Sequence, residues 1–456
     1  MIELSHQRLI EVLGGDSGEA TQASFRGVTI DSRQDCAGKL FVAIRGDNFD
    51  GHRFVATAHS NGAVIALVET PVDCAIAQLV VEDCKQAMGQ LANYWRHQCK
   101  PLVIALTGSN GKTTVKEMLH QILARQAPTL ATRGNFNNDI GVPLTLFELD
   151  AQHKYAVIEM GANHRGEIAR LAQIAEPDIV YVNNVAAAHL AGFGSIQGVI
   201  EAKGEIYAYC RPEHKALFNN DETASQFWKQ NCAATIRLTC ALDKPADVGL
   251  RWSLVDDGLQ IEVSYAGAAH GCRLAVIGEH NARNALAAVS LALLAGLDLA
   301  TAVAGLADFS GVKGRLQILP GPSQSRVIDD SYNANPDSLE AGIKVLCALQ
   351  GTPWLALGDM AELGADALEL HLEAARSARR HGVVKWFGIG EMSCQASREF
   401  GAGGSCHEDI EDMAHSIRSQ IHKDVNLLVK GSRSAGMERL VRMLAQTGPA
   451  GDTNAV

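Results

Sequence analysis

The chain has 456 residues, which is too long for one hydrophobic core, so we expect about two to four domains. Its formal net charge of -11 excludes a general nucleic-acid binder and a protein that adheres to anionic membranes, because both need clustered lysine and arginine. We therefore predict no nucleic-acid or membrane partner, and an anionic substrate would have to be met by local positive groups.

The first section, residues 1–83, is predicted to be a small α/β domain. "MIELSHQRLIEVLGG" has apolar residues at helical spacing with charges between them, and it lacks the apolar core of a signal peptide. Short β-like runs such as "KLFVAIRG" and "AVIALVE" then alternate with Gly- and Asp-rich turns. "CKQAMGQLANYWRHQ" follows as a predicted helix that leads into the next section.

The most specific stretch is "LTGSNGKTT", Leu106 to Thr114, between an apolar run and the helical pattern "VKEMLHQIL". A strand that enters a glycine-bearing turn and leaves as a helix directs backbone N–H groups at one point, where a phosphate can bind. Lys112 adds a positive charge, and Thr113 adds a hydroxyl that can ligate Mg²⁺. The alternative is an ordinary strand-to-helix turn. The predicted nucleotide-phosphate loop comprises Thr107, Gly108, Ser109, Asn110, Gly111, Lys112, Thr113 and Thr114.

Through residues 84–313, strand-like runs such as "KYAVIEMG", "DIVYVNNV" and "KALFNND" alternate with helical stretches. This pattern predicts a parallel sheet covered by helices on both faces. Ligands bind at the carboxyl ends of such strands, so Thr107, Glu159 and Asn183 to Ala187 should face one crevice. There Glu159 is a metal ligand or a solvated loop carboxylate. His189, just past a strand end, is a metal ligand or a packed loop residue.

Several later positions carry a less specific signal. On spacing alone, Lys203 in "EAKGEIY" is a surface lysine of a helix. Asn281 in "GEHNARNALAA" either caps a helix or contacts a base or ribose. Arg315 follows a predicted hinge, where it would reach a phosphate when domains close, or else it is a surface arginine. The strand end in "LVKGSRSAGME" offers either a small pocket for a carboxylate or a basic loop, from Lys430, Ser432 and Arg433.

A third alternating series, which includes "SRVIDDSYNANP" and "VVKWFGIG", predicts a Rossmann-like domain over residues 314–456 with a disordered tail, "QTGPAGDTNAV". Before it, the apolar stretch from Ala285 is interrupted by Gly296 and Asp298, so we predict two buried helices there instead of a membrane span. The predicted fold class is therefore α/β, in three domains that span residues 1–83, 84–313 and 314–456.

The eleven cysteines are scattered along the chain, without a Cys-x-x-Cys pair or a histidine at metal-ligand spacing. We therefore predict reduced and mostly buried thiols, which behave as small apolar side chains. Reduced thiols and the lack of a signal-peptide pattern together predict a cytoplasmic protein.

In this order, the pieces resemble the Mur ligase family, the ATP-dependent amide-forming enzymes of peptidoglycan precursor synthesis. The passages "TRGNFNNDIGVPLTL", "DDSYNANPDSL", "LGDMAELG" and "KGSRSAGME" look most like the member that joins D-alanyl-D-alanine to UDP-N-acetylmuramoyl-tripeptide. The resemblance covers nearly the whole chain. It implies a first domain for the UDP-sugar, a central ATPase domain and a third domain for the incoming amine, with ATP phosphorylating a carboxylate that the amine then attacks.

The resemblance also implies catalytic and metal-binding roles. Lys112 would bind the β- and γ-phosphates, with Thr113 and Glu159 on one Mg²⁺ and His189 on a second. Lys203 matches a lysine that the family carbamylates, which would turn a cation into a carboxylate-like metal ligand. This implied role replaces the surface reading of Lys203.

The same resemblance implies substrate contacts. Asn281, Arg315 and Asp330 match positions that hold adenine, phosphate and ribose. For the UDP-sugar the implied contacts are Ser32 and Gly46, and for the dipeptide they are Lys430, Ser432 and Arg433. Asn137 and Asn138 are also implied as substrate contacts.

The chain departs from the family pattern at one place. Relatives continue after the histidine that matches His189 with Leu-Glu-Gly, whereas this chain reads Leu190-Ala191-Gly192. Three alternatives stay open: another Mur ligase, a folylpolyglutamate synthase-like ligase, and a non-catalytic nucleotide sensor. Folylpolyglutamate synthase begins near its phosphate loop, so the first section argues against it. We predict a monomer, and the sequence leaves open whether the third peptide residue of the substrate is lysine or diaminopimelate.

Overall fold

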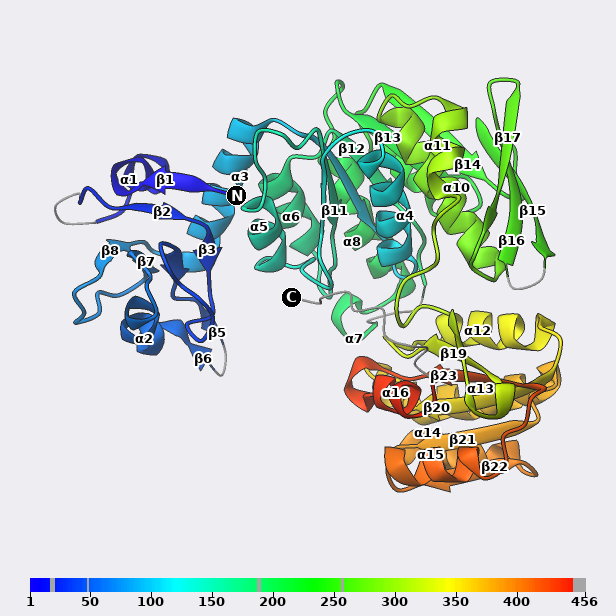
Figure 1. The fold of residues 1–456 in the computed structure, drawn as a ribbon. Helices are drawn as coiled ribbons and strands as arrows, with labels where there is room; N and C mark the ends of the chain where they lie inside the picture. Colours follow the sequence, from blue (N-terminus) through cyan, green and yellow to red (C-terminus); the bar gives the residue numbers. More distant parts are fainter. Residues whose placement is uncertain (17–20, 47–48, 187–189, 256–257, 446–456) are drawn as a thin grey trace.

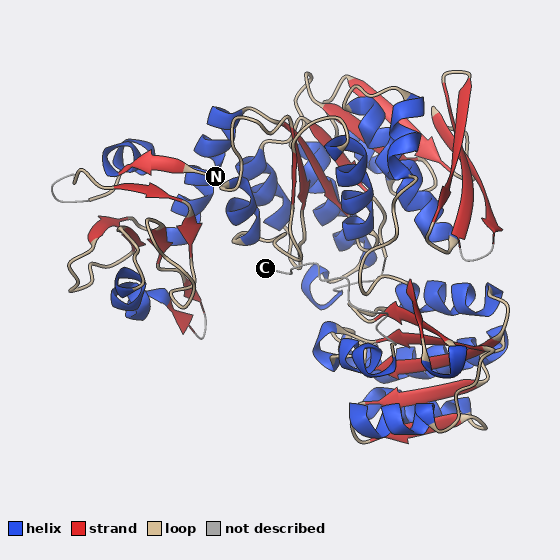
Figure 2. Ribbon diagram, viewed as in Figure 1, coloured by secondary structure: helices blue, strands red, loops and turns tan. Residues whose placement is uncertain are grey.

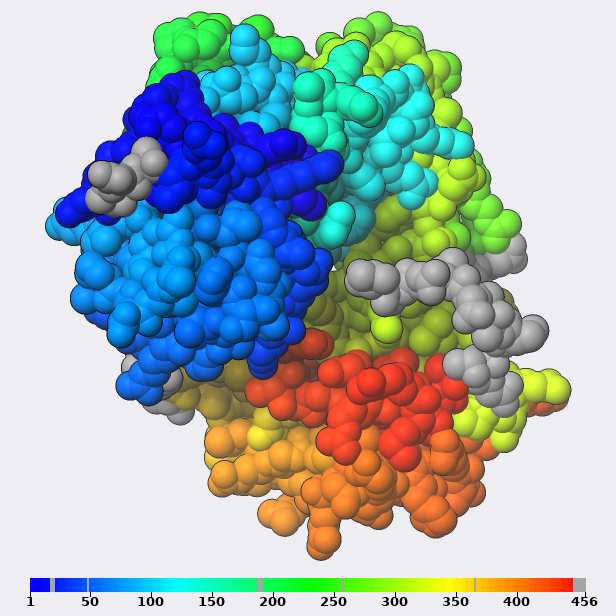
Figure 3. Space-filling model, turned by 60° about the vertical axis from the view of Figure 1, so that its left-hand side comes forward, coloured from blue at the N-terminus to red at the C-terminus, as the bar shows by residue number. Residues whose placement is uncertain are grey.

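The computed structural model describes residues 1–16, 21–46, 49–186, 190–255 and 258–445. Three larger sheets, each with its own helices, follow one another along the chain (Figure 1, Figure 2). The middle section lies above the C-terminal section in both Figure 1 and Figure 3, with the N-terminal section to one side. The predicted α/β fold class is confirmed, and the predicted domain boundaries after residues 83 and 313 fall between the sheets. The predicted disordered tail lies outside the described residues.

The N-terminal section is built on a four-stranded parallel sheet of order β3-β4-β7-β8. Leu67 and Leu79 of this sheet share one hydrophobic core with Met88 of the following helix and Val103 of the middle sheet, so the two sections are packed together. The elements are β1 (Glu3–Ser5), α1 (His6–Leu13), β2 (Ser24–Arg26), β3 (Val28–Thr29), β4 (Leu40–Val42), β5 (Arg45–Gly46), β6 (Phe49–Asp50), η1 (Gly51–Phe54), α2 (Val55–Ser60), β7 (Ile65–Val68) and β8 (Ala77–Val80).

The middle section has a nine-stranded sheet of order β10-β11-β9-β12-β13-β14-β15-β16-β17. Its strands are β9 (Leu102–Thr107), β10 (Thr129–Ala131), β11 (Tyr155–Glu159), β12 (Ile179–Val182), β13 (Lys215–Asn219), β14 (Ile236–Ala241), β15 (Val248–Val255), β16 (Gly258–Tyr265) and β17 (Ala268–Leu274). Its helices are α3 (Cys84–Cys99), α4 (Lys112–Ala124), α5 (Gly141–Leu146), α6 (Glu167–Ala175), α7 (Leu190–Phe193), α8 (Ile196–Ala208), α9 (Ser225–Gln230), α10 (Glu279–Leu294) and α11 (Leu299–Leu306).

The central strands are covered on both faces, as predicted. Successive residues of β9 alternate between two cores, with Val103 and Ala105 in one and Ile104 and Leu106 in the other. Helices α3, α6 and α8 contribute to the first core, and α4, α10 and α11 contribute to the second. Polar side chains at the carboxyl ends of these strands are therefore brought to one edge of the sheet.

The antiparallel end of this sheet was not predicted from the sequence. Strands β15, β16 and β17 pair as an antiparallel meander beyond the parallel strands. In β16 the buried Ile261 and Val263 alternate with the exposed Glu262, which is typical of a sheet with one face in solvent. Helices α10 and α11 confirm the prediction of two buried helices, and no helix in the described part of the chain is long and apolar enough to cross a membrane.

The C-terminal section has a six-stranded sheet of order β18-β19-β23-β20-β21-β22, parallel except for the β18–β19 pair. Its strands are β18 (Gln317–Pro320), β19 (Arg326–Asp330), β20 (Thr352–Gly358), β21 (Lys385–Ile389), β22 (Gly404–His407) and β23 (Val425–Lys430). Its helices are η2 (Pro322–Gln324), α12 (Pro336–Ala348), η3 (Gly364–Asp366), α13 (Ala367–His381), α14 (Glu391–Phe400), α15 (Ile410–Arg418), η4 (Arg433–Ala435) and α16 (Glu438–Leu444).

The prediction that all cysteines are reduced is wrong for two of them. Cys394 of α14 and Cys406 of β22 form a disulfide, whereas the other nine cysteines are free. The two residues are 12 positions apart, and the turn between α14 and β22 brings them together. Spacing rules for Cys-x-x-Cys motifs do not find such a pair, because its proximity depends on how a helix packs beside a strand.

Candidate active site

The phosphate loop runs from the end of β9 to the start of α4, as predicted. Gly108 and Gly111 have φ angles of +146° and +77°, which L side chains rarely adopt. Around Gly111 there is also no space, since an added Cβ would lie 2.5 Å from both Asn183 Nδ2 and Asn284 Oδ1. The glycine before the lysine is therefore required by backbone conformation and by the approach of two asparagines.

Asn184, two residues after the neighbouring strand β12, holds the first half of this loop. Its carbonyl oxygen accepts a hydrogen bond from Ser109 N at 3.0 Å, and its side-chain Oδ1 accepts one from Asn110 N at 2.8 Å. These two N–H groups are thus bonded within the protein. The N-terminus of α4, which begins at Lys112, provides the donors that remain for a phosphate.

We expect Gly111→Ala to lower the free energy of unfolding by about 1–3 kcal/mol, from the positive φ and the close contacts, and to weaken nucleotide binding by about tenfold. Urea unfolding and calorimetry with ADP measure the two effects. Gly382→Ala is the matched control, because Gly382 has a φ of +95° but nothing within 4 Å of an added Cβ. An alanine at 111 that leaves ADP affinity unchanged would contradict this account of the loop.

Lys112 lies over the loop from which it extends. Its Nζ donates hydrogen bonds to the carbonyl oxygens of Gly108 at 2.7 Å and Ser109 at 3.1 Å. Burial lowers the pKa of the Lys112 amine, the nearby carboxylate of Glu159 acts in the opposite direction, and the charge of Arg315 lowers it again. Two cations, Lys112 and Arg315, therefore share one end of the site.

Glu159 ends β11 and is buried, with 2% of its surface exposed. Its Oε1 accepts a hydrogen bond from Asn137 Nδ2 at 2.8 Å. Its Oε2 is buried and has no hydrogen-bond partner among the described residues. A buried carboxylate oxygen without a partner is unfavourable unless a cation or a water meets it, so the side chain fits the predicted role of a Mg²⁺ ligand.

The reading of Lys203 as a surface lysine is wrong, because α8 turns this side chain inward and leaves 2% of the residue exposed. Its Nζ donates to the carbonyl oxygen of Ala162 at 3.3 Å and lies 5.4 Å from the centre of the Phe193 ring. Burial, and then the charge of Lys112, lower the pKa of Lys203 to about 7. The amine is therefore partly neutral at physiological pH.

Asn281 does not cap α10, because its Nδ2 donates to the carbonyl oxygen of Ile277 at 2.8 Å. It belongs instead to a chain of amides. Asn284 Nδ2 donates to Asn281 Oδ1 at 3.3 Å, and Asn284 Oδ1 accepts from Asn183 Nδ2 at 3.1 Å. This chain joins the start of α10 to the phosphate loop, since Asn183 Nδ2 also donates to the carbonyl oxygen of Asn110 at 2.9 Å.

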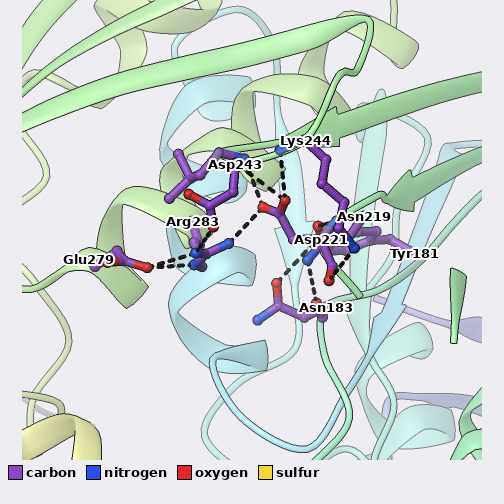
Figure 4. A network of polar contacts seen from close by, with 9 residues as sticks. Tyr181, Asn183, Asn219, Asp221, Asp243, Lys244, Glu279 and Arg283 are labelled. Carbon is purple, nitrogen blue, oxygen red and sulfur yellow. Dashed lines mark hydrogen bonds and ion pairs between the residues drawn. The ribbon is translucent and has the colours of Figure 1, made fainter. Parts of the chain in front are cut away.

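A cluster of charges that the sequence analysis missed lies next to these amides (Figure 4). Arg283 of α10 donates to Asp221 Oδ2 at 2.6 Å, Asp243 Oδ2 at 2.7 Å and Glu279 Oε1 at 2.7 Å. The carboxylate of Asp221 also accepts from the backbone N–H groups that follow β14, including that of Leu242 at 2.8 Å. The cluster thus fastens the start of α10 to two loops at the strand ends.

We expect Arg283→Ala to lower the free energy of unfolding by about 1–3 kcal/mol, because it leaves the largely buried Asp221 carboxylate without its charged donor. Urea unfolding measures this loss. Arg376→Ala is a matched control, since Arg376 also meets three carboxylates, of Glu369, Glu373 and Glu399, but on the surface. Equal losses in the two variants would contradict a special role for the cluster.

The C-terminal section closes the site from the other side. Asp330 ends β19 and Lys430 ends β23, and their Oδ2 and Nζ atoms form a buried ion pair at 2.5 Å. The Arg315 guanidinium lies 4.2 Å from the centre of the Tyr332 ring. Asn335 Nδ2 donates to Asn110 Oδ1 at 2.9 Å, which links the C-terminal section directly to the phosphate loop.

These residues surround one cavity of ≈ 860 Å³. The predicted residues that line it are Gly108, Ser109, Asn110, Gly111, Lys112, Thr113, Thr114, Asn137, Asn138, Glu159, Lys203, Asn281, Arg315, Asp330 and Lys430. The lining residues that the sequence analysis did not select as site residues include Asn219, Asp221, Asp243, Arg283, Tyr332 and Asn335.

Five predicted site residues do not line the cavity. Thr107 lies fully buried beneath the loop, and Ser432 is buried and donates from its hydroxyl to the carbonyl oxygen of Asp359 at 2.6 Å. The others are Ser32, Gly46 and Arg433, of which the first two belong to the N-terminal section. His189 lies outside the described residues, as does Ala187.

Comparison with known protein families covers most of the chain. Residues 24–96 match the Mur ligase family catalytic domain, residues 106–292 match the Mur ligase middle domain, and residues 314–433 match the Mur ligase glutamate ligase domain. The chain belongs to the Mur ligase family. The predicted resemblance is thus confirmed, and with it the prediction of an ATP-dependent ligase.

Individual Mur ligases are similar to this chain over nearly their full lengths. The UDP-N-acetylmuramoyl-tripeptide--D-alanyl-D-alanine ligase of Escherichia coli (strain K12) is 38% identical over 452 residues, which are 98% of this chain and 100% of that protein. The structure of MurF from Acinetobacter baumannii has a TM-score of 0.90 at 36% identity and covers 97% of this chain and 98% of its own. The MurF ligase of Thermotoga maritima, solved in complex with ADP, has a TM-score of 0.82 at 26% identity, with 92% and 96% covered.

The alternative of a folylpolyglutamate synthase is not favoured over the Mur ligases. The Mycobacterium tuberculosis enzyme of that name shares the fold with a TM-score of 0.64, but it is 16% identical and covers 79% of this chain. A likeness at that level of identity concerns the fold alone. The fuller cover by Mur ligases agrees with the expectation that the first section argues against a synthase of this kind.

Proposed function

We propose that this Mur ligase joins D-alanyl-D-alanine to the terminal carboxylate of UDP-N-acetylmuramoyl-tripeptide and converts ATP to ADP and phosphate. The observation that carries the proposal is the shared cavity, where the phosphate loop, Glu159 and Lys203 face Asp330 and Lys430 of the C-terminal section. The choice of substrates rests on the relative with 38% identity, whose name gives this tripeptide and this dipeptide.

The reaction has two displacements. A carboxylate oxygen of the tripeptide attacks the γ-phosphorus of ATP, the bond from that phosphorus to the bridging oxygen breaks, and ADP leaves. The dipeptide amine then attacks the acyl carbon and loses a proton, and phosphate leaves with the former carboxylate oxygen. The first step brings a carboxylate to a triphosphate, so the site must lower their repulsion with cations.

Lys112 and Arg315 provide this charge from the protein. They lie near enough for the charge of Arg315 to lower the pKa of Lys112, so a polyphosphate between them would relieve an existing repulsion. Lys112 would bind the β- and γ-phosphates from the loop. Arg315 would meet the phosphates from the C-terminal section, which makes its contribution depend on the closed arrangement of the two sections.

Mg²⁺, when bound, would screen the negative charge of the phosphates. Among the described residues, no group of three His, Cys, Asp or Glu side chains could hold a metal ion. A cation would therefore depend on the unpartnered Glu159 oxygen, the Thr113 hydroxyl and oxygen atoms of ATP. We propose His189 and a carbamylated Lys203 as ligands of a second Mg²⁺.

Carbamylation of Lys203 would convert a buried cation into an anion. The neutral amine adds CO₂ to give a carbamate and releases one proton. With a pKa lowered to about 7 by burial, Lys203 is neutral in a large fraction of molecules at pH 7. A carbamate would also remove the repulsion between Lys203 and Lys112, which the pKa of Lys203 reflects.

The remaining site residues would bind the other substrates and the nucleoside. Asn281 and Asp330 would hold adenine and ribose, and Asn137 and Asn138, which line the cavity, would contact the tripeptide substrate. We further propose that the enzyme acts in the cytoplasm as a monomer. Ser32 and Gly46 for the UDP-sugar, and Lys430, Ser432 and Arg433 for the dipeptide, complete the proposed contacts.

Release of phosphate from ATP tests this function. We expect release that requires both UDP-N-acetylmuramoyl-tripeptide and D-alanyl-D-alanine, with D-alanine and glutamate inactive as control amines. Release with glutamate in place of the dipeptide would instead point to another Mur ligase, and no release with any amine would favour a non-catalytic nucleotide sensor.

A further inference from the structure

Lys116 is a buried charge for which the proposed reaction has no direct use. It lies on α4 one helical turn after Lys112, and none of its surface is exposed. Its Nζ donates to the carbonyl oxygen of Thr132 at 2.5 Å and lies 2.6 Å from Glu117 Oε1. Burying an ammonium group is unfavourable even when it is paired, so its presence calls for a reason other than packing.

Thr132, which accepts the hydrogen bond from Lys116, also contacts Glu159, the predicted metal ligand. Thr132 follows β10 and is itself buried, and its backbone N–H donates to the Val157 carbonyl oxygen at 3.0 Å. Its side-chain Oγ1 accepts a hydrogen bond from the backbone N–H of Glu159 at 3.0 Å. Five residues further along the same loop, Asn137 donates to Glu159 Oε1. The loop that Lys116 holds therefore contacts Glu159 at its backbone and at its carboxylate.

Packing alone does not explain a lysine at this position. The neighbours of Lys116 on α4, Val115, Met118 and Leu119, belong to a hydrophobic core, and an unbranched apolar side chain would suit that surface. Replacement of a buried ion pair by apolar residues is often neutral or stabilising. Glu117 is partly exposed, so water can solvate its carboxylate without Lys116.

We propose that Lys116 is a positioning residue that, through Thr132, fixes Glu159 relative to Lys112 and so sets the affinity of the site for a nucleotide-bound divalent cation. The inference rests on the proposed function only in assigning Glu159 to the cation. Lys112 and Lys116, spaced i and i+4, lie on the same side of α4. Helix α4 thus carries Lys112, which would bind the phosphates, and Lys116, whose buried amine would position the Glu159 carboxylate for the metal.

The test uses Mn²⁺ as the cation and the full chain with ADP. Electron paramagnetic resonance of free Mn²⁺ gives the affinity of the enzyme–ADP complex for the metal, and calorimetry in EDTA gives the metal-free affinity for ADP. The variants are Lys116→Met and Thr132→Val, which removes the hydroxyl at nearly constant shape. The controls are Thr132→Ser, which keeps the hydroxyl, and Lys344→Met, since Lys344 is largely exposed on α12.

We expect Lys116→Met and Thr132→Val each to weaken Mn²⁺ binding by about tenfold or more, with metal-free ADP affinity unchanged and both controls like the wild type. Wild-type Mn²⁺ affinity in Lys116→Met would overturn the proposal, as would an equal fall in metal-free ADP affinity. If Lys116→Met does not fold, the contrast between Thr132→Val and Thr132→Ser tests the link from Thr132 to Glu159, and equal Mn²⁺ affinity in these two variants would overturn the proposal. A wild type that binds Mn²⁺ and ADP but ligates no dipeptide would overturn the proposed function alone.

Discussion

Lys203→Ala is expected to reduce ligation by about a thousandfold or more, because it removes both the buried amine and the carbamate proposed to form on it. The activity should return in part when bicarbonate or a short carboxylic acid such as acetate is added, since alanine leaves space for a carboxylate near the Ala162 carbonyl and the Phe193 ring. Coupled measurement of ADP release gives both values.

The pH dependence of the wild type follows from the same amine. Only neutral Lys203 adds CO₂, and its pKa is lowered to about 7, so the neutral fraction rises as the pH increases through 7. We therefore expect activity to depend strongly on added bicarbonate at pH 6 and weakly at pH 8. Lys344→Ala controls for loss of a lysine at an exposed position. Full activity of Lys203→Ala without any added acid would contradict the proposal that a carbamylated Lys203 is required for ligation.

Lys112→Met is expected to lower kcat/KM for ATP by about a thousandfold, or about 4 kcal/mol of transition-state stabilisation. The lysine is held over the loop by the carbonyl oxygens of Gly108 and Ser109, so its charge is already placed where the phosphates would bind. Methionine keeps an unbranched side chain of similar length and removes the charge. Steady-state phosphate release at varied ATP concentration measures the loss.

The stability of the Lys112→Met variant shows whether Lys112 acts only in catalysis or also contributes to folding. Burial lowers the pKa of Lys112, which means that the folded chain holds this cation at a cost, and its removal should leave the urea midpoint unchanged or raised. A variant that loses activity and stability in parallel would point to a folding role. A loss of less than about threefold in kcat/KM would contradict the assignment of Lys112 to the phosphates.

Local sequence predicted those parts of the site that a single strand and its next turn determine. The phosphate loop and Glu159 both follow from apolar strands that end in polar residues, because parallel strands bring their carboxyl ends to one edge. A strand end also predicted Lys430, whereas Arg315 was predicted from its position after a hinge. Glu159 and Lys430 lie on the cavity because their strands end there.

The sequence could not predict features that depend on how distant segments pack. The inward face of α8, which buries Lys203, is not distinguishable by spacing in "EAKGEIY" from a solvated face, and only the family resemblance assigned Lys203 to the site. The charge cluster around Arg283 needs carboxylates from separate segments, including Asp221 at a separation of 62 residues. The contact of Asn335 with Asn110 spans 225 residues, and only the closed arrangement of two sections brings it about. The contacts of Lys116 and the disulfide could not be predicted for the same reason.

In the proposed reaction, ATP phosphorylates the tripeptide carboxylate before the amine attacks. Substrate labelled with ¹⁸O in its terminal carboxylate tests this most directly, by mass spectrometry of the products. With both carboxylate oxygens labelled, we predict one ¹⁸O in the released inorganic phosphate and one in the new amide carbonyl for each amide bond formed, because phosphate leaves with one of the two former carboxylate oxygens. Inorganic phosphate without label, or label that appears in AMP, would contradict an acyl-phosphate ligase.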